Sequence, residues 1–366
     1  MGAMTTLDLN SESWEILRQF LPSDLDQSAK AQGAFRRARG EIKNASVLLR
    51  LILLHVAGGL SLEQAVLRAR ENHLVTISAV GLFKRLRCAG PWLTWLTAET
   101  VKSLSKDWDD ALWKQRPIRV LDATDIEEPG PTGTDWRLHY SLRLPQLSCD
   151  FLELTDVHGG ETLKRLPVDK GDIVLCDRGY SHRAGVAQVL KQEADVVVRL
   201  NAGAFPLEDQ AGNKMNLPEL VKHLKVDEIG EWPVCFTQDG QRYSMRLCVL
   251  RKSEAAASLA RRKAEKKAGN QVQPETLTLA AYVLVLTSLP TSWGPAALIM
   301  ELYRARWQVE LAFKRLKQLL SAGHVPKTTD ASSRAWLQAK VLTALLIEHM
   351  IHAGRFFSPW GYRLSR

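Results

Sequence analysis

The spacing of apolar residues along the chain changes close to residue 117. Before that point the apolar residues recur at helical spacing. The run 45–57 (ASVLLRLILLHVA) predicts an apolar helix that ends at the Gly58-Gly59 pair. Ser61, with Gln64 three residues later, predicts a capping box that opens a helix over Leu62–Asn72.

A second short helix follows after a tight turn. Ser78 is a suitable N-cap for Ala79–Cys88, which carries Lys84, Arg85 and Arg87, and Pro91 is expected to stop it. Two short helices around a tight turn, the second of them basic, are typical of a DNA-reading helix-turn-helix. Helical bundles produce the same pairs, so both interpretations stay open.

Beyond Pro117 the apolar residues alternate or form short β-rich runs, which predicts strands. Three strands are followed by a strand, a helix and a strand, an order typical of a mixed α/β core. The predicted strands are Ile118–Leu121, Trp136–Arg143, Phe151–Val157, Ile173–Cys176 and Val196–Leu200, with the helix over Arg183–Glu193.

Residues 201–290 interrupt this order. Asp239-Gly240 is a turn dipeptide that predicts a strand pair. Seven Lys and Arg against two Glu give the stretch from Arg251 to Lys267 a charge of +5, which fits either a solvated helix face or a phosphate-contacting surface. A last helical region is expected from Ile299 to about Ala353.

Composition narrows the class of protein. With 45% hydrophobic and 24% charged residues, the chain of 366 residues is expected to be globular, with two or three domains. Five scattered cysteines without a C-x-x-C pair fit a reduced cytosol rather than a disulfide or zinc framework. A net charge of +9 makes a polyanion the first partner to consider. Neither a signal peptide nor a membrane span is expected, since residues 1–13 carry acids and the uncharged run 276–300 is broken by prolines.

Two aspartates directly follow predicted strands. Asp122 comes after Ile118–Leu121, and Asp177 comes after Ile173–Cys176. Carboxylates at the ends of neighbouring strands can converge, and their mutual repulsion favours a bound cation. Either could instead be an ordinary turn residue. Five other acids are rejected as main ligands because of their expected positions: Asp125, Glu127 and Glu128 in a loop, Asp172 at the opposite end of its strand, and Glu301 on the far side of its helix.

The segment YRARWQVELAFKRLKQLL supplies a third acid, Glu310. If it forms one continuous helix, at about 100° per residue Tyr303, Arg306 and Lys317 share a face with Glu310. A neighbouring apolar stripe would dock this helix on the sheet; it comprises Leu302, Val309, Phe313, Leu316 and Leu320. An amphipathic helix with an ordinary Arg–Glu pair remains the alternative.

These residues form the pattern Y-x2-R-x3-E-x6-K, which resembles the signature of the DDE cut-and-paste transposases of bacterial insertion sequences, specifically the insertion-sequence-four family. Asp122 in VLDATDIEEPG and Asp177 in IVLCDRGYSHRAG are similar to the first and second Asp segments of that family. The resemblance covers roughly residues 30–350.

The resemblance implies an α/β fold: an RNase H-like core, with a mixed five-stranded sheet and helices, interrupted by a β-rich insertion. An all-helical N-terminal DNA-binding domain over 1–110 would precede the core, which would comprise 111–200 and 291–366 around the insertion at 201–290.

The same resemblance implies a metal-dependent DNA transposase. Asp122, Asp177 and Glu310 would be catalytic and would bind two Mg²⁺ ions, with Mn²⁺ able to replace them. An aromatic residue of the insertion would hold a flipped base, for which Tyr282 is the first choice and Trp232 and Trp293 are alternatives. The residues expected to contact DNA are Tyr303, Arg306, Lys317, Lys314, Arg178 and Tyr282.

The expected partners are double-stranded DNA, at the transposon ends and the target, and a second copy of the chain in the DNA complex. The expected location is the bacterial cytoplasm, at the nucleoid. Alternatives are a catalytically silent DNA-binding protein derived from a transposase, an RNase H-like nuclease without strand transfer, and a scaffold that does not bind DNA.

Overall fold

The structure is a computed structural model, and it describes residues 11–34, 42, 44–106, 116–127, 134–144, 147–156, 158–268, 272–319, 325 and 329–354. Three residues named above, Glu128, Val157 and Leu320, lie outside this part of the chain.

The described chain before residue 107 contains helices and no strands. The Ser61–Gln64 capping box is present, and Ser78 accepts from the backbone N–H of Gly81, as predicted. The helix Ala79–Cys88 ends before Pro91 as predicted, and Pro91 lies in the first turn of the next helix, where its missing N–H has no intrahelical partner to lose. The helices are α1 (Ser11–Arg18), α2 (Leu25–Ala31), α3 (Ala45–Val56), α4 (Leu62–Glu71), α5 (Ala79–Cys88) and α6 (Gly90–Lys106).

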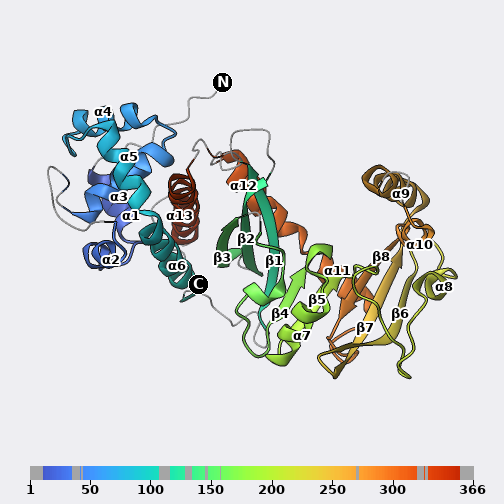
Figure 1. The fold of residues 1–366 in the computed structure, drawn as a ribbon. Helices are drawn as coiled ribbons and strands as arrows, with labels where there is room; N and C mark the ends of the chain where they lie inside the picture. The colour runs from blue at the N-terminus through green and yellow to red at the C-terminus, as the bar shows by residue number, and fades with distance from the viewer. Residues whose placement is uncertain are drawn as a thin grey trace.

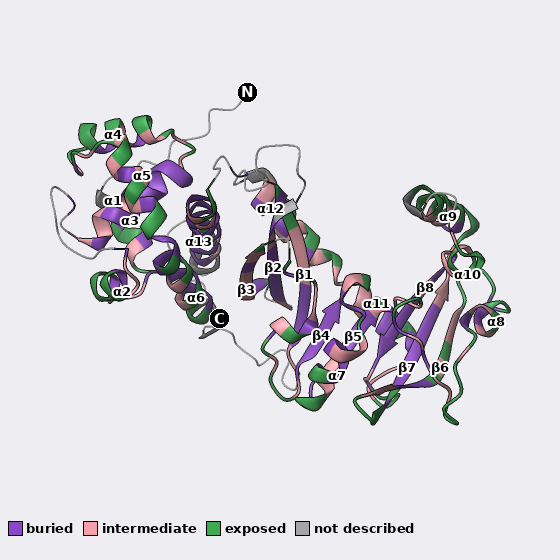
Figure 2. Ribbon diagram, viewed as in Figure 1, coloured by how far each residue is buried: buried purple, intermediate pink, exposed green. Residues whose placement is uncertain are grey.

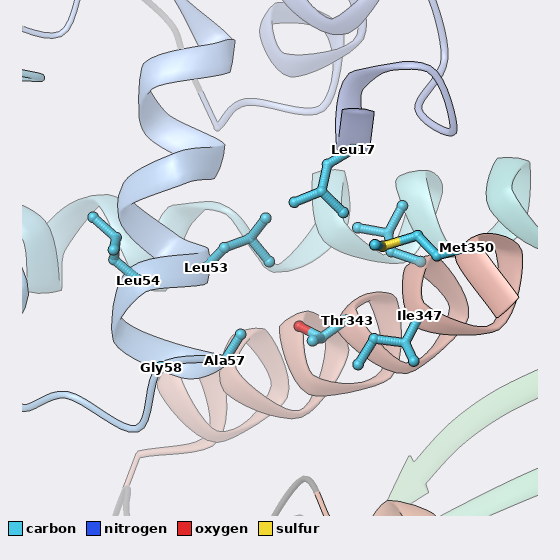
Figure 3. A pocket seen from close by; sticks show the side chains of 9 residues that line it. Leu17, Leu53, Leu54, Ala57, Gly58, Thr343, Ile347 and Met350 are labelled. Carbon is cyan, nitrogen blue, oxygen red and sulfur yellow. The ribbon is translucent and has the colours of Figure 1, made fainter. Parts of the chain in front are cut away.

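The last described helix, α13 (Asp330–Gly354), packs against α3, α5 and α6 and against β3, and so joins the helical region to the sheet (Figure 1). A small apolar cavity lies between α1, α3 and α13, lined by Leu17, Leu53 and Met350 among others (Figure 3). The catalytic acids expected above do not line it.

One sheet of eight strands runs through the rest of the molecule, in the order β3-β2-β1-β4-β5-β8-β7-β6. The pairs β1–β4 and β4–β5 are parallel and the other pairs are antiparallel. Helix α7 (Arg183–Lys191) connects β4 to β5. The strands are β1 (Ile118–Glu127), β2 (Thr134–Leu144), β3 (Ser148–Asp156), β4 (Ile173–Cys176), β5 (Asp195–Arg199), β6 (Ile229–Gln238), β7 (Gln241–Arg251) and β8 (Tyr282–Thr287).

The expectation of a five-stranded sheet was wrong, because the strands of the insertion continue the same sheet. Val197 of β5 pairs with Thr287 of β8, and β8 pairs with β7. The predicted hairpin turn between β6 and β7 is confirmed, with positive φ at Asp239 and Gly240. Short helices α8 (Leu217–Val221) and α10 (Pro274–Leu279) and the longer α9 (Glu254–Ala268) accompany these strands, and α9 is largely exposed (Figure 2).

Alternating side chains divide the core between the two faces of the sheet. In β4, Ile173 and Leu175 join the cluster that includes the N-terminal helices, α11, α12 and α13. Val174 and Cys176 join the other cluster, which includes α7 and the insertion. The sheet is therefore buried on both faces over its parallel part, as parallel strands require.

The segment predicted as one helix is two helices, α11 (Ala296–Arg304) and α12 (Trp307–Leu319). The intervening turn has i→i+3 hydrogen bonds, from the N–H of Ala305 to Leu302 and from the N–H of Arg306 to Tyr303, both 3.1 Å. The apolar stripe survives this break, since Val309, Phe313 and Leu316 are buried against the sheet. No described helix is long and apolar enough to cross a membrane.

Candidate active site

The sheet register brings Asp122 and Asp177 to neighbouring positions. Leu121 of β1 pairs with Cys176 of β4 in a parallel ladder, and the two aspartates are the next residues on their chains. Asp177 follows the end of β4, as predicted, and its Oδ1 accepts from the backbone N–H of Gly179 at 2.7 Å. Asp122 is not at a strand end, however, because β1 continues to Glu127 through its pairing with β2.

Arg306 connects Asp122 to Glu310. Its Nη1 donates to Asp122 Oδ2 at 2.9 Å, and its Nη2 donates to Glu310 Oε1 at 2.6 Å. The turn between α11 and α12 places the guanidinium between the two carboxylates, where it is 18% exposed. The structure therefore joins Asp122 and Glu310 through a half-buried cation of the chain itself.

Asp122 has an unusual proton affinity. Burial raises its pKa to about 7, and the charge of Asp177 adds to the rise although the Ala123 N–H and Arg306 oppose it. Burial thus disfavours the ionised form of Asp122. Such a carboxylate suits a site in which a bound cation neutralises the acids.

Besides Arg306, four of the residues expected to contact DNA lie near these acids or on the same helix as Glu310. Tyr303 is mostly buried beside Arg306 and Asp177, and burial raises its pKa to about 12. Arg178 is exposed and donates to Asn201 Oδ1 at 3.0 Å. Lys314 is exposed and Lys317 half-buried on α12.

Tyr282 is less suited to its expected role. Its ring is 5% exposed at the start of β8, and the Arg251 guanidinium lies 4.9 Å from the ring centroid. The alternatives Trp232 and Trp293 are half-buried.

The acids that were rejected as main metal ligands form other interactions. Asp125 and Glu127 are on β1, not in a loop as expected, and Asp125 accepts from Arg137 at 2.8 Å. Asp172 is buried with Arg119, 2.9 Å away, and Glu301 pairs with Arg304 on α11.

Two residues of this region were not anticipated from the sequence. Arg199 ends β5, and the β4–β5 register places it beside Asp177. Glu161, in the loop after β3, lies against Gly179. The Gly-Gly-Glu sequence at 159–161 was the only signal that the sequence offered for Glu161. It could not predict the contact with Gly179, because the two residues are distant in the sequence and meet only in the folded chain.

The donor chemistry of the site fits a hard divalent cation, because Asp122, Asp177 and Glu310 supply only carboxylate oxygens. Within the described residues no three acidic, His or Cys side chains are gathered closely enough to hold a metal ion, and Arg306 takes the position between two of the acids. The buried Tyr180 hydroxyl has no partner in the described part of the chain, which indicates that a polar ligand belongs here.

A mixed sheet with acids on adjacent central strands and a third on a helix defines a class of enzymes that act on phosphodiesters. Residues 154–347 match the transposase DDE domain family, and this chain belongs to it. Such domains use divalent metal ions, and the protein is an enzyme that cleaves and transfers DNA.

Similar proteins carry transposase names. The chain is 33% identical to the putative transposase InsL for insertion sequence element IS186A of Escherichia coli (strain K12), over 96% of this chain and 98% of the relative. It is also 33% identical, with the same coverage, to the transposase for IS421 of Escherichia coli. The transposase for IS231B of Bacillus thuringiensis subsp. berliner is 23% identical, over 87% of this chain and 74% of the relative.

Proposed function

We propose that this protein is a cut-and-paste transposase of the insertion-sequence-four family. It cleaves DNA at the ends of its own mobile element, through hairpin ends, and joins the resulting 3′-hydroxyls to target DNA. The observation that carries the proposal is the side-by-side placement of Asp122 and Asp177, with Glu310 connected to Asp122 through Arg306.

Two Mg²⁺ ions, replaceable by Mn²⁺, would be held by Asp122, Asp177 and Glu310. When bound, such a pair activates the attacking oxygen and stabilises the leaving one in an in-line displacement at phosphorus. The protein needs no separate base for this reaction, and its acids serve to hold and orient the ions.

Arg306 has a second role in this proposal. Its planar guanidinium matches a phosphate as well as it matches two carboxylates. Once its two carboxylate partners were neutralised by bound cations, Arg306 would be free to bind the phosphate next to the cleaved bond. Tyr303, Lys314, Lys317 and Arg178 would contact the flanking DNA.

The strand order supports an RNase H-like core. Strands β3-β2-β1-β4-β5 form an antiparallel meander followed by parallel strands, and the chain then leaves through 201–290 and returns with the helix that carries Glu310. We retain the domain limits 1–110, 111–200 with 291–366, and 201–290. The helical N-terminal region would bind DNA through exposed Lys84 and Arg87 of α5, and two copies would pair the two transposon ends.

The test is cleavage of duplex DNA that carries the inverted repeats flanking the gene, in the presence of Mg²⁺ or Mn²⁺. Asp122→Asn, Asp177→Asn and Glu310→Gln should each lower the cleavage rate at least about 10³-fold while end binding survives. Glu301→Gln is the matched control, because Glu301 is exposed and pairs only with Arg304 among the described residues. Normal cleavage by Glu310→Gln would overturn its assignment.

The products separate the alternatives. Joined strands identify a transposase, nicked DNA without joined strands identifies a nuclease, and binding without any cleavage by the unaltered chain identifies a silent DNA-binding protein.

A further inference from the structure

A fourth carboxylate lies beside the three acids. Glu161, in the loop between β3 and the short 3₁₀ helix Leu163–Arg165, packs its carboxylate against Gly179, where the Cβ of any other residue would overlap it. Gly179 in turn donates its N–H to Asp177. Glu161 and Asp177 therefore meet at the same three-residue turn.

The loop that carries Glu161 is held in place by its backbone. Arg165 Nε donates to the Gly160 carbonyl at 3.1 Å, and Arg137 Nη1 donates to the Gly159 carbonyl at 3.2 Å. Gly159 also packs so tightly on Thr155 that a Cβ would overlap that side chain. The loop thus delivers Glu161 to a defined position rather than leaving it on a free surface.

No hydrogen bond or ion pair reaches the Glu161 carboxylate from the described residues. Asp125 takes Arg137 Nε, and Glu153 takes Arg165 Nη1, so both neighbouring cations are already paired with other acids. Arg137 and His182 act on this half-buried carboxylate only through their charge, while burial and neighbouring acids disfavour its ionised form, so a bound cation would relieve the repulsion.

A second and independent observation points to the same place. The side chain of Tyr180 is 0% exposed, and its hydroxyl has no hydrogen-bond partner among the described residues. Tyr180 closes the 3₁₀ turn that follows Asp177 and whose Gly179 contacts Glu161, and burial together with the negative charge of the nearby acids raises the pKa of its hydroxyl. A buried hydroxyl is normally satisfied, and a hydrated cation would supply the missing oxygen.

We propose that Glu161 is a fourth carboxylate of the catalytic centre. Asp122, Glu161 and Asp177 do not close around one point in the structure, and they would move together to hold a divalent cation, with the Tyr180 hydroxyl binding water of that hydrated ion. This inference rests on the proposed function, since it assigns a further ligand to the same site.

The probe is Mn²⁺ titrated into the full-length, DNA-free protein, with the free ion followed by its electron paramagnetic resonance signal. Glu161→Gln should weaken Mn²⁺ binding about tenfold and Tyr180→Phe by a smaller factor, because one removes a charge and the other a water contact. Glu161→Asp, which keeps the charge, should retain part of the affinity. Glu193→Gln is the control, since Glu193 is exposed and pairs with Lys170.

The dependence of cleavage on Mn²⁺ separates a ligand from a structural residue. Excess Mn²⁺ should restore cleavage by Glu161→Gln, whereas a structural defect would lower the rate at every concentration. If Glu161→Gln fails to fold, Tyr180→Phe and Glu161→Asp decide.

Three results are distinguishable. Loss of affinity in Asp122→Asn and Glu161→Gln supports the inference. Loss in Asp122→Asn, with Glu161→Gln within twofold of the unaltered protein, overturns it and leaves the proposed function intact. Unchanged affinity in both variants contradicts the metal assignment of the proposed function as well.

Discussion

At the scale of single residues, the site is organised around a competition for carboxylates. Arg306 pairs with Asp122 and Glu310, the same two acids that would hold metal ions. Ion pairs of this kind are stabilising only while both partners stay together, since a buried carboxylate without a cation is costly. The exchange of Arg306 for metal ions would therefore couple ion binding to the release of a phosphate-binding side chain.

Replacing Arg306 tests this competition. In Arg306→Gln we expect Mn²⁺ to bind the DNA-free protein about tenfold more tightly, a gain of about 1.4 kcal/mol, because the competing cation is gone. Cleavage of end DNA should nevertheless fall, since the phosphate contact is lost with it. Calorimetric titration measures the first effect and a cleavage assay the second.

Arg304→Gln is the matched control for that prediction. Arg304 is exposed two residues earlier and pairs with Glu301, so its loss should change neither quantity. Weaker Mn²⁺ binding in Arg306→Gln would contradict the competition.

At the scale of elements, α13 contains a buried cation whose cost can be measured. Lys340 is 4% exposed, its Nζ lies 5.0 Å from the Trp336 ring, and burial lowers its pKa to about 8. Between pH 8 and about 10.4 the unfolded chain therefore binds more protons at this residue than the folded one does. The contribution of Lys340 to stability accordingly rises with pH across this window.

Lys340→Met should remove that cost. At pH 7 we expect its free energy of unfolding to exceed that of the unaltered protein by on the order of 2 kcal/mol, and the difference should shrink toward pH 10. Urea unfolding at several pH values measures it. Lys84→Met on the exposed face of α5 serves as control, and a difference independent of pH would contradict the argument.

The β6–β7 turn requires positive φ at Asp239 and Gly240. Gly240 has φ of 75°, and no atom lies within 4 Å of where its Cβ would be. Gly240→Ala should therefore destabilise the protein by about 1 kcal/mol through backbone strain. Gly203→Ala, at a position without positive φ, should have little effect in the same unfolding measurement, and equal losses in both variants would exclude this cause.

Local signals predicted many elements well. The capping box at Ser61, the hairpin at Asp239-Gly240 and the apolar run of β4 depend on neighbours in sequence, and the structure contains each of them. The length of β1 was missed because Asp122 and the residues after it are held by β2. The joining of β8 to β5 and the turn at Arg306 likewise depend on distant partners, as does the contact of Glu161 with Gly179.

The candidate site likewise combines features that local sequence predicts with features that depend on distant partners. Asp177 could be placed from sequence because a strand ends just before it, whereas Asp122 was singled out for a strand end that does not exist. Its position is nevertheless next to Asp177, since the parallel β1–β4 pairing stops at Leu121. The pairing of β1 with β4, rather than the end of a strand, positions Asp122.

At the scale of the whole molecule, positive charge is found both beside the acids and at a distance from them. Arg178 and Arg199 lie at the carboxyl ends of β4 and β5, next to Asp177. Helix α9, with exposed Arg262 and Lys263, accompanies the insertion strands at the other end of the sheet (Figure 1). A short duplex of end DNA centred on the acids would contact Arg178 and Arg199. The basic residues of α9 would stay in solvent when this substrate is bound.

Salt dependence distinguishes the two groups. Each phosphate contact contributes about −0.9 to the slope of log K against log salt concentration. Arg178→Gln with Arg199→Gln should therefore lower the magnitude of this slope by about two for a short end duplex, and should weaken binding at low salt. Arg262→Gln with Lys263→Gln removes the same net charge but should leave the slope unchanged. Equal changes in both double variants would show that net charge alone governs the binding, whereas the expected difference requires the phosphates to lie along the edge of the sheet that holds the acids.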